Sequence, residues 1–171
     1  MASNHSLTYL ELDGYSIGDK GVARIADAIK INRSLACLHL GESGVGDDGA
    51  PRLAEALTVN QTLTHLGLNR NSIGDKGAKF LVQSLEGNKT LLDLQLVHNQ
   101  IQVEGVKALA RGFCKQNRDI VLVGSFEGYS GKTLLCMADA LALSNDLKDH
   151  AMARTIIHLI LDDSYFAIRA Q

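Results

Sequence analysis

The six residues SIGDKG occur twice in this chain, at 16–21 and again at 72–77. The two copies begin 56 residues apart, and midway between them the segment 44–49 reads GVGDDG, a looser form of the same pattern. The chain therefore repeats with a period of 28 residues. Repeats of this length predict stacked structural units, because a single unit cannot bury its own apolar face.

Four full units can be aligned along the chain, and a partial fifth begins at Asp119. In the first half of each unit leucines alternate with polar residues, as at Leu66 and Leu68, which predicts a short strand with one buried face. In the second half apolar residues recur at helical spacing, which predicts an amphipathic helix of about three turns. The full units begin at Ser6, Ser34, Thr62 and Thr90.

Two small motifs mark the ends of the expected helices. Gly18 and Gly21 flank the start of the first helix, and Asp19 between them places a negative charge at the positive end of the helix dipole. Asn32 follows the same helix, and asparagine recurs at the equivalent position of the next two units. An asparagine in the left-handed conformation ends a helix, so we expect these residues to act as C-terminal stops.

The third and fourth units both carry the run LxxLxLxxN, which in the third consists of Leu63, Leu66, Leu68 and Asn71. This run followed by a helix resembles the leucine-rich repeat. The 28-residue length with a full helix is similar to the ribonuclease-inhibitor-like class of that family, which includes the sensor region of NLR receptors and the Ran GTPase-activating protein. The resemblance extends from residue 6 to about residue 125.

The resemblance implies an α/β fold, a curved solenoid with parallel strands on its concave face and helices on its convex face. We expect the repeats in residues 1–125 and a helical C-terminal cap in residues 126–171, because an uncovered last repeat would expose its core. No comparable cap is visible before Ser6, so the chain is either a fragment or one that tolerates or uses an open N-terminal edge, and self-association through that edge is left open. Tyr15 and Ser43 replace the asparagine of the family in the first two units, which predicts an incomplete side-chain ladder there.

The concave face of such a solenoid is the natural contact surface, and the resemblance implies that it binds a protein. Its side chains are the strand residues that point away from the leucines, together with those just past each strand end. They differ from unit to unit while the core positions stay apolar; the alternative is a solvated face without a binding role. The predicted partner-binding residues are Tyr9, Glu11, Asp13, Cys37, His39, Glu42, His65, Asn69, Arg70, Asp93, Gln95, His98 and Phe126.

Four of these residues suggest a sharper chemistry. Cys37 and His65 hold the same position on neighbouring strands, His39 lies two residues along, and Asp93 follows beyond His65. A thiol, two imidazoles and a carboxylate suit zinc, and a thiol beside an imidazole is also the pairing that activates a cysteine nucleophile. However, the face is open to water and shows no repeated ligand spacing such as CxxC. We therefore predict no metal, no cofactor and no catalytic residue, and leave open whether the cysteine and the two histidines bind a metal.

The segment after the repeats raises a separate possibility, because IVLVG, GYSGKT and LILDD follow one another in the order of a phosphate-binding-loop ATPase. Gly128, Gly131, Lys132 and Thr133 would then wrap phosphate oxygens. The spacing does not fit, since the motif requires a glycine where the chain has Phe126. We favour a cap for this segment and keep nucleotide binding as the less favoured alternative.

The composition excludes several classes of partner. The chain has 171 residues, 46% of them apolar, and a net charge of −2, so it lacks the basic field that would attract nucleic acid. We find neither a signal peptide nor a run near the ~18 apolar residues of a membrane span, so we expect no membrane partner. Cys37, Cys114 and Cys136 are odd in number and unrelated to the repeat, which favours free thiols in a reducing, cytoplasmic compartment.

These features predict a non-enzymatic interaction protein that binds a folded partner through its concave face and regulates or inhibits it. One alternative is a GTPase-activating or other regulatory scaffold, for which Arg70, Asn71 and His98 supply polar residues beyond the strand ends. This repeat class also occurs in secreted bacterial effectors, so an effector that acts inside a host cell is a further possibility. The identity of the partner does not follow from the sequence.

Overall fold

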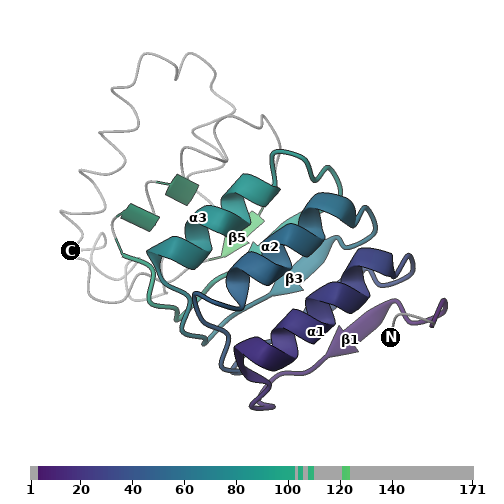
Figure 1. Cartoon of the computed structure of the whole chain (residues 1–171), viewed down its shortest axis with the longest axis horizontal. Coiled ribbons are helices and arrows are strands. Elements are labelled where there is room, and N and C mark those ends of the chain that lie inside the picture. Colours follow the sequence, from purple (N-terminus) through teal and green to yellow (C-terminus); the bar gives the residue numbers. More distant parts are fainter. Residues whose placement is uncertain (1–3, 103, 106–107, 110–120, 124–171) are drawn as a thin grey trace, which may run out of the picture.

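The computed structural model of the chain describes residues 4–102, 104–105, 108–109 and 121–123. Short strands and helices alternate along these residues (Figure 1). The strands are β1 (Tyr9–Glu11), β2 (Cys37–His39), β3 (His65–Gly67), β4 (Asp93–Gln95) and β5 (Val121–Val123), and the helices are α1 (Gly18–Ile31), α2 (Ala50–Val59) and α3 (Asp75–Ser84). The alternation confirms the strand and helix predicted for the first three units and the strand predicted for the fourth.

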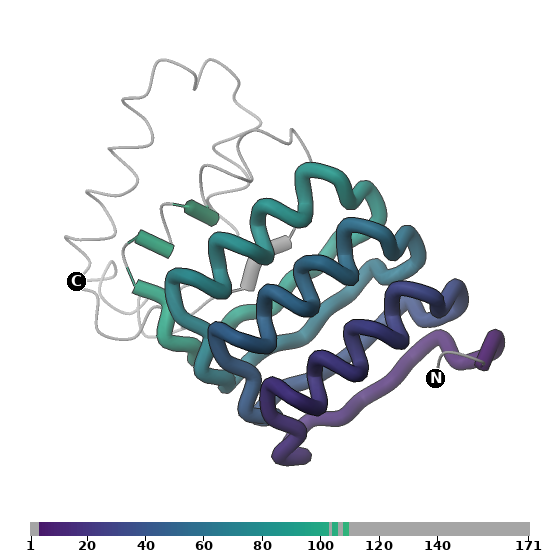
Figure 2. Tube along the Cα trace, in the orientation of Figure 1, coloured from purple at the N-terminus to yellow at the C-terminus, as the bar shows by residue number. Residues whose placement is uncertain are grey.

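The strands form one parallel sheet in the order β1-β2-β3-β4-β5. The three helices lie side by side on one face of this sheet, so the described residues form two layers of a curved α/β solenoid (Figures 1 and 2). β5 pairs with β4, as expected for the partial fifth unit. The cap predicted at 126–171 lies outside the described residues.

Leucines from successive strands build the core between the two layers. Leu10, Leu38, Leu66 and Leu94 pair with one another along the sheet, one from each of β1 to β4. Leu38, Leu66 and Leu94 are at most 1% exposed. The apolar stripe of each helix, for example Val22, Ala26 and Ile29 of α1, packs against them from the other layer. Because the register never shifts, every outward position of one strand has a neighbour on the next.

The SIGDKG motif connects each repeat to the following one. Asp19 lies in the first turn of α1, as predicted, but its Oδ1 accepts hydrogen bonds from the backbone N–H groups of Gly46 (2.7 Å) and Gly49 (3.0 Å). Asp47 Oδ1 makes the two equivalent bonds one repeat further on, both of 2.8 Å. A Cβ on residue 49 would lie 2.5 Å from Asp19 Oδ1, which explains the recurrent glycine. The aspartate therefore caps the helix of the next repeat.

Asn32 and Asn60 are the C-cap residues of α1 and α2, as predicted, but the left-handed conformation predicted for them is wrong. Asn32 has φ −69° and ψ 139°, which is extended backbone. The side chains instead form a ladder between repeats, in which Asn60 Nδ2 donates to Ile29 O at 2.9 Å while Asn60 Oδ1 accepts from Leu63 N at 2.8 Å. Asn60 is 1% exposed, so the ladder satisfies backbone groups inside the core.

The same ladder begins at Asn4, which the sequence alignment had left outside the first unit. Asn4 Oδ1 accepts from Leu7 N at 2.6 Å, just as Asn32 Oδ1 accepts from Leu35 N at 2.7 Å. Asn32 Nδ2 in turn donates to Asn4 O at 2.9 Å. Asn4 stands 28 residues before Asn32, so the repeat pattern starts two residues earlier than Ser6.

A second ladder lies beyond the strand ends, at the asparagine of LxxLxLxxN. Asn71 Nδ2 donates to Leu40 O, one repeat back, at 2.8 Å, and Asn71 Oδ1 accepts from the backbone N–H groups of Ser43 and Val45 in that preceding repeat. In the second repeat Ser43 supplies the donor half of this role, since its Oγ donates to Leu12 O at 2.9 Å. The side-chain ladder, predicted to be incomplete at position 43, therefore keeps a donor there. Tyr15, at the equivalent position of the first repeat, is 67% exposed.

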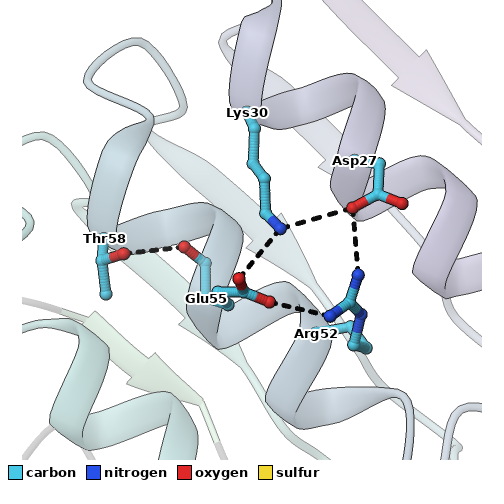
Figure 3. A network of polar contacts seen from close by, with 5 residues as sticks. All are labelled: Asp27, Lys30, Arg52, Glu55 and Thr58. Carbon is cyan, nitrogen blue, oxygen red and sulfur yellow. Dashed lines mark hydrogen bonds and ion pairs between the residues drawn. The ribbon is translucent and has the colours of Figure 1, made fainter.

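Ion pairs join α1 to α2 on the convex side. Lys30 Nζ lies 3.3 Å from Asp27 Oδ1 and 3.1 Å from Glu55 Oε1. Arg52 reaches the same two carboxylates at 3.1 and 2.9 Å, and Thr58 Oγ1 donates to the Glu55 carbonyl at 2.7 Å (Figure 3). Pairs exposed to water to this degree contribute about 0.2–1 kcal/mol each. The network therefore aligns neighbouring helices, while the buried core supplies most of the stability.

Candidate functional site

The constant register arranges seven of the predicted partner-binding residues in two rows on the face of the sheet opposite the helices, which we call the concave face. Residues paired across neighbouring strands form the first row, which contains Tyr9, Cys37, His65 and Asp93. The second row contains Glu11, His39, Gly67 and Gln95. The alternation in the sequence therefore identified the outward positions correctly.

Tyr9 and Glu11 form a hydrogen-bonded pair at the N-terminal end of the concave face. The Tyr9 hydroxyl donates to Glu11 Oε2 at 2.7 Å, and the centroid of its ring lies 5.6 Å from that of His39. The hydrogen bond to the Glu11 carboxylate raises the pKa of Tyr9 to about 12. The ring is 51% exposed, so Tyr9 presents a neutral phenol with a large apolar surface to solvent.

Cys37 and His39 are in direct contact in the middle of the face. Cys37 Sγ lies 3.2 Å from His39 Nε2, and the His39 ring lies over Gly67 on the next strand. A Cβ on residue 67 would come within 2.5 Å of His39 Nδ1, so glycine is what makes room for the ring. Desolvation raises the pKa of the Cys37 thiol, and the carboxylates of Asp93 and Glu11 raise it further. The protonated thiol is therefore the favoured form.

His65 makes its polar contact with the residue that precedes it in the sequence, since His65 Nδ1 lies 2.8 Å from Thr64 Oγ1. The four residues considered for a metal are therefore not a common cluster: Cys37 contacts His39, and Asp93 is hydrogen-bonded elsewhere. Across residues 4–102 and the shorter described segments, no group of three or more His, Cys, Asp or Glu side chains is arranged to hold a metal ion. The described face thus gives the zinc hypothesis no support.

Side-chain amides connect the third and fourth repeats. Gln95 Nε2 donates to Asp93 Oδ2 at 2.9 Å, and Asn69 Nδ2 donates to Gln95 Oε1 at 2.9 Å. Asn69 Oδ1 accepts from Val97 N at 2.9 Å. The second carboxylate oxygen of Asp93, Oδ1, is shielded from water and accepts no hydrogen bond from the described part of the chain. A shielded acceptor without a donor costs free energy.

Three predicted residues beyond the strand ends share an unusual backbone conformation. Glu42, Arg70 and His98 have φ values of 52°, 55° and 55°, in the left-handed region, and Gly14 has φ 77° at the equivalent position of the first repeat. The left-handed region costs a non-glycine residue roughly 1–2 kcal/mol. Arg70 Nη1 also lies 3.5 Å from Glu42 Oε1, and both side chains are more than half exposed. Exposed side chains beyond the strand ends whose backbone is held in this costly conformation are candidates for function.

Some outward residues support their neighbours, which the sequence did not reveal. Asp13 Oδ1 accepts a hydrogen bond from Gly41 N at 2.6 Å, so this predicted binding residue also holds the end of the next strand. Gly41 and Gly67 make space for Asp13 and His39, respectively, and both were missed as site residues. Each is a glycine at a position on the concave face, beside a bulkier residue one repeat earlier. This pattern in the sequence could have identified both.

Several predicted residues lie outside the described part of the chain. They are Phe126 and the phosphate-loop candidates Gly128, Gly131, Lys132 and Thr133. A separate finding concerns membranes: none of the helices within the described ranges has the length and apolar character needed to cross a bilayer.

Comparisons with known proteins agree with this geometry. A family model described as Leucine Rich repeat matches residues 3–26, 59–82 and 87–110. The chain is similar to the solved structure of actin-binding site 2 of leiomodin-1, with a TM-score of 0.65, 20% identity, and coverage of 96% of this chain and 89% of that chain. It is also similar to the C-terminal domain of tropomodulin from Caenorhabditis elegans, with a TM-score of 0.65, 13% identity, and coverage of 81% and 84%.

No curated protein matches the chain in sequence. The fold is nevertheless unambiguous, because strand, left-handed turn and helix recur every 28 residues and the asparagine of LxxLxLxxN bonds the preceding repeat. Family match, structural likeness and repeat geometry lead to the same identification. The chain therefore carries leucine-rich repeats and has the leucine-rich repeat fold.

Proposed function

We propose that the chain binds a folded protein through its concave face and regulates that protein by covering part of its surface. One contrast supports the proposal. From β1 to β4 the central residue of each strand is leucine, whereas the first row beside it changes from tyrosine to cysteine, histidine and aspartate. The same backbone carries both columns, so packing of the fold does not account for the variety of the first row.

The side chains of this face suit recognition of a protein. Tyrosine and arginine dominate the energetics of many interfaces, and Tyr9 and Arg70 are both exposed here. Hydrogen bonds already orient Tyr9 toward Glu11 and Gln95 toward Asp93 before any partner arrives. Side chains ordered in advance lose less conformational entropy on binding.

The proposal assigns no catalytic step to the face. A cysteine nucleophile acts as the thiolate, and the raised pKa of Cys37 opposes that form. Arg70, a candidate in the alternative of a GTPase-activating scaffold, is paired with Glu42 at 3.5 Å. Binding of a partner therefore makes more use of the observed contacts than either chemical role does.

Actin is the first partner to test, because the similar domain of leiomodin-1 is named as an actin-binding site. The test compares the intact chain with a concave variant that carries His65→Ala, Arg70→Ala and Gln95→Ala. The matched control carries the same number of substitutions on exposed helix positions, Arg24→Ala, Lys79→Ala and Gln83→Ala.

Binding is measured by co-sedimentation with filamentous actin, by equilibrium binding to monomeric actin, and by affinity capture from native lysate for other partners. All three proteins must first show the same circular dichroism and melting temperature. We expect a partner that the intact chain and the helix control retain and the concave variant loses. Equal retention by all three would contradict the assignment of the concave face.

A further inference from the structure

The first strand leaves one edge of the sheet open. β1 is the end strand of the order, and among the described residues none pairs with its outer edge. Its bonds to β2 come from alternate residues, since Thr8 O accepts from Cys37 N at 3.0 Å and Leu12 N donates to His39 O at 2.9 Å. The backbone groups of the intervening residues, including Glu11, therefore point away from β2. Such a row of free donors and acceptors is a template for another strand.

The core behind this edge is also incompletely covered. Five apolar residues of the first repeat, Leu7, Leu10, Leu12, Ile17 and Ile25, are only partly buried against the core. Their equivalents one repeat later are at most 1% exposed, and these are Leu35, Leu38, Leu40, Val45 and Leu53. The difference arises because the second repeat is covered by the first, while the described part of the chain places nothing against the first. An open sheet edge thus coincides with a half-exposed apolar layer.

We propose that this edge pairs with the same edge of a second copy of the chain. A two-fold axis makes the two β1 strands antiparallel and brings the same surface of each copy together. In the register that places Leu10 opposite Leu10 of the second copy, Tyr9 of each copy lies opposite Glu11 of the other. Tyr9 and Glu11 are chemically matched, since the phenol already donates to this carboxylate at 2.7 Å within one chain.

Charge selects this register over its neighbour. A shift that places Glu11 opposite Glu11 would set two carboxylates directly across from each other, which destabilises an antiparallel pair. In the proposed register the half-exposed leucines meet on the helix side and the tyrosine–glutamate pairs meet on the concave side. The two sheets then continue into one another, so a dimer presents both concave faces on a single surface and suits a partner with two equivalent sites.

The first test measures molecular mass by sedimentation over a wide range of protein concentration. The expected mass of the intact chain rises toward twice that of one copy. Glu11→Pro removes an outward N–H that β2 does not use, so we expect this variant to stay a single copy. Glu11→Ala keeps the N–H and is expected to associate. A single copy at every concentration for the intact chain, or association by Glu11→Pro equal to that of the intact chain, would overturn the proposal.

A second pair of variants tests the register and does not depend on how proline is tolerated. Tyr9 is exposed, so Tyr9→Lys and Tyr9→Glu are expected to fold alike, as circular dichroism would verify. Opposite Glu11 of the other copy, the lysine is expected to tighten association about fivefold and the glutamate to weaken it by a similar factor. Equal association by the two variants, or the reverse order, would refute the pairing of residue 9 with Glu11.

Discussion

Asp19 Oδ1 lies 3.0 Å from the backbone nitrogen of Gly49, so the carboxylate of one repeat holds the start of the helix in the next. The same oxygen also accepts from Gly46 N, which places a negative charge where the dipole of α2 is positive. Gly49 is the N-cap residue of α2, and its N–H, which has no partner within the helix, is thereby satisfied. This contact between repeats explains why SIGDKG recurs in the sequence.

Loss of this contact is expected to destabilise the stack. Asp47 makes two bonds of 2.8 Å to the start of the third repeat, to Gly74 N and Gly77 N. We expect Asp47→Ala to lower the free energy of unfolding by about 2 kcal/mol, measured by urea denaturation. The side chain of the neighbouring Asp48 is 84% exposed, and its ion pair with Lys76, at 3.6 Å, is screened by water. We therefore expect Asp48→Ala to change stability little. Equal effects of the two substitutions would contradict the capping role.

Leu66 is expected to be essential for folding. It is 1% exposed in the central strand, and Leu66→Asp would place a carboxylate in the shared core, at a cost above about 4 kcal/mol. Leu92, which is 50% exposed, provides a control of the same size. Leu92→Asp is expected to melt within a few degrees of the intact chain. The measurement is thermal unfolding followed by circular dichroism, and a normal melting curve for Leu66→Asp would refute the assigned strand register.

Gly67 is expected to control the position of the His39 ring. In Gly67→Ala the new Cβ would lie 2.5 Å from His39 Nδ1, so the ring must move and its contact with Cys37 must break. Since the ring borders solvent and can rotate away, we expect a loss of only about 1 kcal/mol. The resonances of the His39 ring should shift in an NMR spectrum. Gly87→Ala is the control, because no atom lies within 4 Å of the added Cβ; unchanged His39 signals in Gly67→Ala would disprove the packing.

The thiol of Cys37 is expected to react slowly with alkylating reagents at neutral pH. Burial, Asp93 and Glu11 raise its pKa above the ordinary value, so the pH profile of alkylation should shift upward. The measurement uses a chain with Cys114→Ser and Cys136→Ser, so that a single thiol reacts. Asp93→Asn should move the profile toward lower pH, and an unshifted profile would contradict the assigned electrostatic cause.

The same thiol links stability to pH. The folded chain holds the Cys37 proton more tightly than the unfolded chain does, so its contribution to stability is complete below the ordinary thiol pKa. That contribution declines as the pH rises past the ordinary value toward the raised one. Over this pH range we expect the stability of Cys37→Ser to fall less than that of the intact chain, because the variant lacks the thiol. Denaturation experiments on both proteins at alkaline pH measure the difference.

The strands were predictable from the sequence because burial alone dictates their pattern. Leu66 and Leu68 alternate with polar residues since only one face of β3 meets the helices. Asn60 shows the limit of such arguments. Its position after α2 suggested a local role, whereas its amide bonds Ile29 O, 31 residues earlier, and only the stacked structure brings the two together.

The candidate site was predictable to the same degree. Alternation placed Cys37, His39 and His65 on one face, and the register confirms that placement. Which of these side chains are in contact depends on their rotamers, and neighbouring residues determine those rotamers. Thr64 engages His65, and the absence of a side chain at Gly67 leaves room for His39. Such pairings arise between adjacent strands and leave no periodic signal in the chain.

The bond between Asp19 and the following repeat also bears on how such a gene can change length. Asp19 and Asp47 each accept from glycine N–H groups 27 and 30 residues downstream, so duplicating or deleting one whole repeat recreates the same spacing at the new junction. A duplication of any other length would leave one carboxylate without its donors and one helix without its cap. Unequal recombination in steps of a full repeat is therefore the route by which this protein can lengthen or shorten during evolution and still fold.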